Sequence, residues 1–67
     1  MNLAKSIKLA LVNANMTQRT LAKSLKTTPA HMSRLANGKA HMNTQVLANV
    51  ARLFGMKVSE FVALGED

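Results

Sequence analysis

The chain has 67 residues and no cysteine, so neither a disulfide framework nor a cysteine-based zinc site can stabilise it. Tryptophan and tyrosine are absent, and Phe54 and Phe61 are the only aromatic residues. This composition favours helices packed on helices over a β-rich core. We find no signal peptide and no apolar run of about 18 residues, so we expect a cytoplasmic protein that is neither secreted nor membrane-spanning.

Acidic residues are missing from most of the chain. The three that occur are Glu60, Glu66 and Asp67, whereas all nine Lys and Arg come before residue 60, and the formal net charge is +6. A cationic excess suits a polyanion, either a nucleic acid or an anionic membrane surface. His31 and His41 stand apart without a third metal ligand, and no glycine-rich phosphate loop is present. We therefore predict no enzyme activity, no metal, no cofactor and no small-molecule ligand.

Proline and glycine are rare, and they stand where helices would begin or end. Pro29 suits the first position of a helix, and Gly38, Gly55 and Gly65 follow apolar-periodic segments. Apolar residues recur at helical spacing in every segment, and no segment alternates as a strand would. The chain therefore predicts an all-α fold, a single compact domain of five short helices over residues 1–67.

The predicted helices run from Asn2 to about Asn13–Asn15, from Thr17 to a corner at Lys26-Thr27, from Thr28 to Asn37, from Thr44 to Phe54 and from Val58 to Leu64. The side chains expected to face the core are Leu3, Ile7, Ala10, Leu11, Ala14, Leu21, Ala22, Leu25, Met32, Leu35, Val46, Leu47, Val50, Ala51, Leu53, Phe54, Val58 and Phe61. Four further apolar residues lie off these faces and are Leu9, Val12, Val62 and Leu64. In a domain this small, such residues are more often partly buried periphery than interface. The last two nevertheless mark the C-terminal end, where we look for contacts between two copies.

Residues 17–37 have the order of a helix-turn-helix: a capped helix, a tight corner and a second helix that opens on Pro29. In this motif the second helix lies in the major groove of double-stranded DNA, and the first crosses the backbone. Together with the acid-free sequence around it, the motif favours DNA over a membrane surface. Five separate apolar faces also describe a globule, and not one long amphipathic helix.

On these residues the chain resembles the lambda repressor-like, Cro/C1-type helix-turn-helix family of phage and bacterial repressors. The matching segments are Thr17-Gln18, Leu21-Ala22, Leu25, Thr28 through Leu35, Asn37-Gly38, residues 50–55 and residues 58–61. The resemblance implies a five-helix domain that binds operator DNA as a homodimer, most like a small phage Cro-type repressor.

Three residues depart from the family pattern. Lys26 stands where the family usually has glycine, and a lysine at positive φ costs on the order of 1 kcal/mol. Leu11 and Ala36 replace a buried Arg–Glu pair that links the first and third helices in many members. Losing both charges together is often neutral or stabilising, whereas losing one would leave the other unpaired. We therefore expect Leu11 and Ala36 to pack in the core.

The resemblance and the helix geometry together assign candidate contacts. The candidates for base contacts are Pro29, Ala30, His31, Ser33 and Arg34. The candidates for phosphate contacts are Thr17, Gln18, Arg19, Lys26, Thr28, Asn37, Lys39 and His41. Arg34 is the strongest, because a guanidinium can bond guanine O6 and N7 together. The structural alternative is capping alone for Thr17 and Thr28, and a solvated surface charge for the cationic residues.

The leading functional hypothesis is a Cro-like repressor that is essentially only a DNA-binding domain. An antitoxin of a toxin–antitoxin pair uses the same fold, but the tail after Leu64 is short for a segment that wraps a toxin. A protein-interaction module that has lost DNA binding is a third hypothesis, and the basic, polar third helix argues against it.

Overall fold

The computed structural model describes residues 2–66, so Asp67 of the acidic end lies outside the described residues. Five helices are present there: α1 (Leu3–Ala14), α2 (Gln18–Ser24), α3 (Pro29–Ala36), α4 (Thr44–Leu53) and α5 (Val58–Leu64). The prediction of an all-α fold with five helices is confirmed, and residues 2–66 contain no strand.

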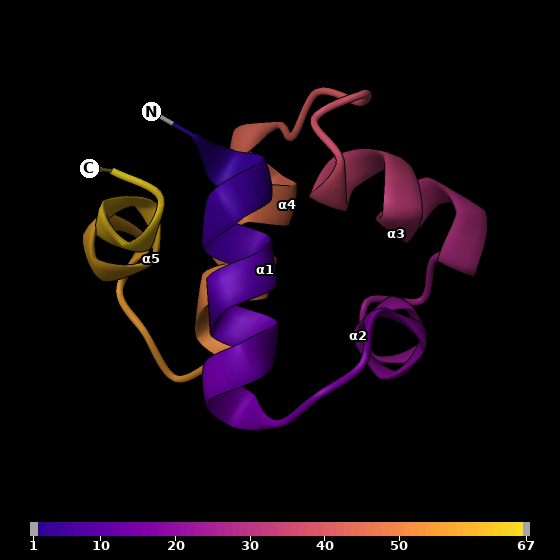
Figure 1. The fold of residues 1–67 in the computed structure, drawn as a ribbon, viewed down its shortest axis with the longest axis horizontal. Coiled ribbons are helices and arrows are strands. Elements are labelled where there is room, and N and C mark those ends of the chain that lie inside the picture. The colour runs from indigo at the N-terminus through magenta and orange to yellow at the C-terminus, as the bar shows by residue number, and fades with distance from the viewer. Residues whose placement is uncertain (1, 67) are drawn as a thin grey trace.

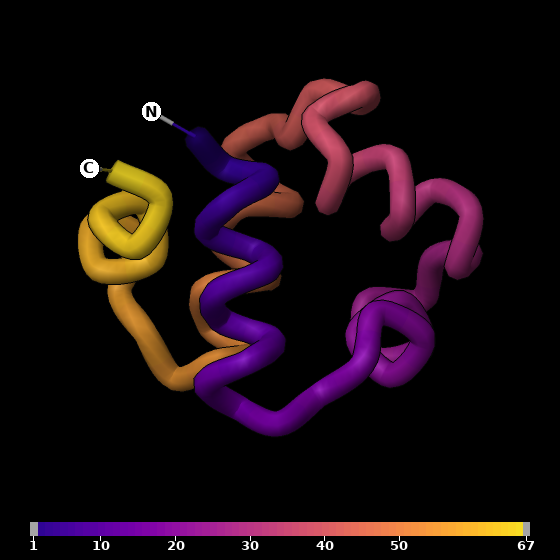
Figure 2. The backbone as a smooth tube through the Cα atoms, in the orientation of Figure 1, coloured from indigo at the N-terminus to yellow at the C-terminus, as the bar shows by residue number. Residues whose placement is uncertain are grey.

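The helix α1 runs through the middle of the molecule. The helix α5 lies on one side of it, α2 and α3 lie on the other, and α4 lies behind it (Figure 1). The helix pairs that pack most extensively on each other are α1 with α5, α1 with α3, α2 with α3, and α4 with α5. The beginning of α1 and the end of α5 meet at the same edge (Figure 2). The helix-turn-helix unit is thus held on the rest of the fold mainly through α1.

Local sequence signals explain where the helices begin and end. Asn2 caps α1 by accepting a hydrogen bond from the Lys5 backbone at 3.1 Å, and Asn15 ends it in the left-handed conformation with φ 53°. Asn43 caps α4 by accepting from the Val46 backbone at 2.8 Å. The observed α4 is one residue shorter than predicted, because residue 54 already serves as its C-cap.

The corner between α2 and α3 holds a lysine in the left-handed backbone conformation. Lys26 has φ 57°, as expected for a residue that stands where glycine is usual. The turn is closed by the Thr27 backbone N–H, which donates to the Ala22 carbonyl at 2.9 Å. Thr28 then caps α3, and Pro29 occupies its first helical position, where a missing N–H has no partner to lose. The corner therefore fixes where the exposed side of α3 points.

The core draws on all five helices and on one residue of the α3–α4 loop. Its buried hydrophobic members are Ile7, Ala10, Leu11, Leu21, Ala22, Met32, Leu35, Ala36, Met42, Val50, Ala51 and Phe61. The expectation for Leu11 and Ala36 is confirmed, because their exposed fractions are 6% and 0%. The core thus contains apolar side chains where many family members are expected to have an ion pair.

Three residues predicted to face the core do not. Val58 is 40% exposed and Leu53 is 38% exposed, and Ala14 is also exposed. The physical reason is their position at helix ends: Ala14 closes α1, and Leu53 and Val58 stand on either side of the α4–α5 turn. The helical period of the sequence predicts which face of a helix is apolar. It does not predict where the neighbouring helix ends, and beyond that point the apolar face is left uncovered.

The α1–α5 contact is close. Gly65 follows α5 and lies against the start of α1, where an added Cβ would meet the Asn2 carbonyl oxygen and would come within 2.5 Å of the Ser6 hydroxyl. Ser6 is fully buried and donates a hydrogen bond to the Val62 carbonyl at 3.4 Å. The absence of a side chain at position 65 lets the two helices approach this closely.

Candidate nucleic-acid interface

The helix α3 has one buried face and one exposed face. Its buried residues are Met32, Leu35 and Ala36. With about 100° of rotation per residue, Ala30 and Arg34 lie on the opposite face, and both are exposed. Because α3 forms the outer edge of the molecule beside α2 (Figure 1), this face is open to a large partner.

The other base-contact candidates lie beside or on the flanks of that face. Ser33 is half-buried and lies next to Arg34, whereas Pro29 and His31 are exposed on opposite sides of the helix. His31 lines a hollow together with Val46 and Asn49 of α4. The five candidates are therefore brought to one end of the molecule, but they do not all point the same way.

The hydroxyl and amide groups of α3 also stabilise the helix ends. The Thr28 hydroxyl oxygen accepts from the His31 backbone N–H at 3.1 Å, which confirms its capping role. A hydroxyl that accepts one bond still has its own hydrogen to donate, so capping leaves Thr28 able to contact a phosphate. Asn37 is the C-cap, and its side-chain Nδ2 donates to the Ser33 hydroxyl at 3.3 Å.

The start of α2 carries three phosphate-contact candidates. The Thr17 hydroxyl caps the helix by accepting from the Thr20 backbone at 3.2 Å. Gln18 is half-buried and Arg19 is exposed. The backbone N–H groups of a first helical turn and the positive end of its dipole favour an anion. This helix end thus combines a capping hydroxyl, an amide and a cation.

The loop after α3 carries Lys39 and His41, both exposed. The Lys39 backbone N–H donates to the Arg34 carbonyl at 2.8 Å, and the buried Met42 anchors the far end of the loop. His41 lines a hollow with residues at the start of α1, including Leu3. The loop is therefore tied to the core at both ends while its two basic side chains remain at the surface.

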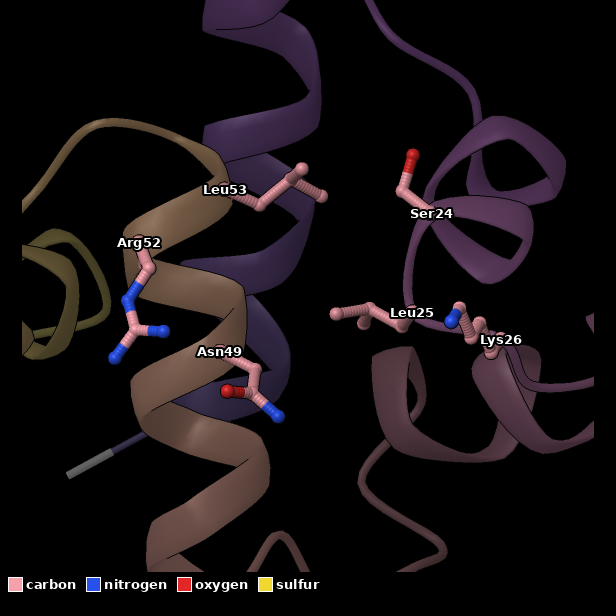
Figure 3. Close-up of a pocket in the computed structure, with 6 residues that line it drawn as sticks. All are labelled: Ser24, Leu25, Lys26, Asn49, Arg52 and Leu53. Atoms are coloured by element: carbon pink, nitrogen blue, oxygen red, sulfur yellow. The ribbon is translucent and has the colours of Figure 1, made fainter.

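Lys26 lies apart from these groups. It lines a hollow between the corner and α4 with Arg52, and Leu25 and Leu53 point toward each other across it (Figure 3). Arg52 was not among the predicted contacts. No local signal could have paired positions 26 and 52, because only the tertiary packing brings the corner and α4 together.

The acidic residues are separated from α2 and α3. Residues 2–59 contain no carboxylate side chain, and Glu60 belongs to α5, which lies on the other side of α1 from α2 and α3 (Figure 1). Among residues 2–66, no three His, Cys, Asp or Glu side chains gather as a metal site would require. No helix in the described part of the chain is long and apolar enough to cross a membrane.

Comparison with known proteins agrees with this geometry. Residues 7–67 match the family model of the Cro/C1-type helix-turn-helix DNA-binding domain. No curated protein sequence matches the chain. Among solved structures, the clp gene regulator ClgR from Corynebacterium glutamicum is similar, with a TM-score of 0.88 and 22% sequence identity over 96% of this chain and 68% of the other. That level of identity supports the same fold.

Proposed function

The chain belongs to the family of Cro/C1-type helix-turn-helix DNA-binding domains, and on that premise we propose that it is a sequence-specific transcriptional regulator of the Cro-like phage or prophage repressor type. As a member of a DNA-binding family it is not an enzyme, and its partner is double-stranded DNA. The observation that carries the regulatory proposal is the exposed face of α3, which presents Ala30 and Arg34 in surroundings without carboxylates. The gene-regulatory role stated for ClgR supports it.

We infer that base recognition centres on Arg34. A guanidinium that bonds guanine O6 and N7 contributes roughly 1–3 kcal/mol of discrimination against the wrong base. Ala30 and the ring of Pro29 suit the methyl group of thymine, and Ser33 can bond several bases. His31, on the flank toward α4, suits either a guanine N7 or a phosphate. The helix would thus read few bases by hydrogen bonds and others by apolar contact.

Phosphate contacts on both sides of α3 would fix its register in the groove. The proposed contact residues are Thr17, Gln18, Arg19, Lys26, Thr28, Asn37, Lys39 and His41. The hydroxyl, amide and cationic groups at the start of α2 and in the loop after α3 support this assignment, because they flank the recognition helix in sequence on both sides. Lys26 faces the hollow beside α4, so its removal should weaken binding least.

We further propose that two copies bind one operator in the bacterial cytoplasm, on half-sites about one helical turn apart. Support for a dimer comes from α5, where Val58 is 40% exposed and Val62, one turn later on the same side, is half-buried. Leu64 packs against the core instead. An apolar strip at the C-terminal helix suits a self-complementary contact between two copies.

The deciding experiment is selection of bound sites from random duplexes, followed by titration of the best site at several salt concentrations. We expect a consensus sequence with two-fold symmetry and an affinity that falls by about 0.9 log units per log unit of salt for each phosphate contact. Binding without sequence preference, or a flat salt response, would contradict the proposal.

A further inference from the structure

The chain contains six asparagines, and Asn37 is the one followed by glycine. In an Asn-Gly pair the backbone nitrogen of the glycine can attack the side-chain amide carbon, because no Cβ on the second residue obstructs the approach. Asn37 and Gly38 are both exposed, directly after the last turn of α3. The pair therefore combines a permissive sequence with an accessible position at the end of the recognition helix.

The attacking nitrogen is loosely held. The Gly38 N–H donates to the Leu35 carbonyl at 3.3 Å, which is long for a backbone hydrogen bond, whereas the next residue, Lys39, donates to the Arg34 carbonyl at 2.8 Å. The Asn37 amide makes a 3.3 Å bond to the Ser33 hydroxyl. The Gly38 nitrogen and the Asn37 side-chain amide can therefore both give up their present hydrogen bonds at a small cost in free energy.

The other asparagines are held more firmly or have a side chain next to them. Asn2 and Asn43 cap helices, with their Oδ1 atoms 3.1 Å and 2.8 Å from the backbone nitrogens they accept from. Asn13 is followed by Ala14 and Asn49 by Val50, so in both cases a side chain stands beside the attacking nitrogen. Asn15 is followed by a methionine whose backbone N–H donates at 2.9 Å. Attack by the following backbone nitrogen is therefore favoured at Asn37 over the other asparagines.

We propose that Asn37 is a site of spontaneous deamidation that ends DNA binding by the modified chain; the loss of binding rests on the function proposed above. The deprotonated Gly38 nitrogen forms a bond to the Asn37 Cγ, and the bond from Cγ to the side-chain nitrogen breaks, so that ammonia leaves and a cyclic imide remains. Water then adds to one imide carbonyl and opens the ring. The product is an aspartate or an isoaspartate at position 37.

Either product damages the interface. The new carboxylate is ionised at neutral pH and stands where an amide was proposed to donate to a phosphate. It also places a negative charge at the C-terminal end of α3, where the helix dipole disfavours one. In the isoaspartate the main chain gains a methylene group, which disturbs the hydrogen bond from Lys39 to Arg34. The proposed contact of Asn37 with a phosphate would hold its amide away from Gly38, so bound DNA protects the site.

The experiment compares fresh protein with protein kept in warm, mildly alkaline buffer, with and without an excess of a duplex selected for binding. Peptide mass mapping locates the exchange of amide for acid, and each sample is then titrated with the duplex. We expect modification at position 37, slower modification in the presence of the duplex, and an affinity that falls in proportion to the modified fraction. Asn37→Asp should bind on the order of tenfold more weakly than the fresh chain, as for the loss of one hydrogen bond to a charged group.

Asn37→Gln is the matched control, because its longer side chain would have to close a larger ring. We expect its affinity to stay at its own starting value through the same treatment, and circular dichroism checks that each variant is folded. Absence of modification at position 37, or modification without loss of affinity, overturns the proposal. If fresh protein binds no duplex while the mass change still occurs at position 37, the proposed function is wrong. The proposed loss of DNA binding on deamidation is then wrong as well.

Discussion

Lys26 offers a quantitative test of how the corner before α3 is built. Its φ of 57° lies in the left-handed region, where a residue with a Cβ is raised by roughly 1–2 kcal/mol. Glycine has no such penalty but loses about 0.5–1 kcal/mol more chain entropy on folding. Taking the middle of each range, the difference predicts that Lys26→Gly stabilises the fold by about 0.75 kcal/mol. In a domain of this size, that corresponds to a rise in melting temperature of about 3–6 °C.

Gly55 allows the opposite substitution, from glycine to a residue with a Cβ at positive φ. Its φ is 70°, and an added Cβ would meet no heavy atom within 4 Å, so Gly55→Ala tests the backbone term without a steric clash. The same arithmetic predicts a loss of about 0.75 kcal/mol. The two substitutions should therefore move the unfolding midpoint in opposite directions by similar amounts.

The assay is urea unfolding followed by helical circular dichroism, with midpoints compared at equal slope. Lys26→Ala is the control, because it removes the charge but keeps a Cβ at the same φ. If Lys26→Gly is no more stable than Lys26→Ala, the reasoning from backbone conformation is refuted. Duplex titrations of the same two variants separate stability from DNA contact, since both lose the ammonium group.

Three further substitutions test the interface and the α1–α5 contact. Arg34→Ala should lower discrimination at one base position by roughly 1–3 kcal/mol, visible as a relaxed consensus in site selection. Lys39→Ala should weaken all duplexes alike and reduce the salt slope by about one; a change confined to one base position would contradict the phosphate assignment. Gly65→Ala should lower the urea midpoint, because its Cβ would meet the Asn2 carbonyl oxygen and lie 2.5 Å from the Ser6 hydroxyl. An unchanged midpoint would show that α5 can move away from α1 without loss.

The ends of the helices were predictable because their signals are local. Thr17 and Thr28 each accept a hydrogen bond from a backbone N–H three residues later, and that relation lies within a short stretch of sequence. The positive φ of Lys26 was implied by the resemblance instead, because the family usually has glycine at that position. Where a helix starts, turns and stops in this chain is decided within about one turn of the helix.

The failures concern relations between helices. Val58 has helical spacing to the buried Phe61, yet it is exposed because it stands at the first position of α5 beside a turn. The hollow shared by Lys26 and Arg52 depends on how far α4 lies from the corner. Neither the exposure of Val58 nor the separation of α4 from the corner can be predicted from a local sequence pattern, because both result from packing several helices around one core.

The positions of the candidate residues around α3 also limit which of them can contact bases together. Five residues of α3 were predicted to contact bases, but rotation around the helix separates them into Ala30 and Arg34 on the outer face and Pro29, His31 and the half-buried Ser33 beside it. Of these five, Arg34 alone can bond one base through two parallel hydrogen bonds. Discrimination by hydrogen bonding should therefore concentrate at one base pair of each half-site. The remaining specificity then comes from single hydrogen bonds of the kind proposed for Ser33 and His31, from apolar contacts with thymine methyl groups and from the shape of the duplex that the flanking phosphate contacts enforce.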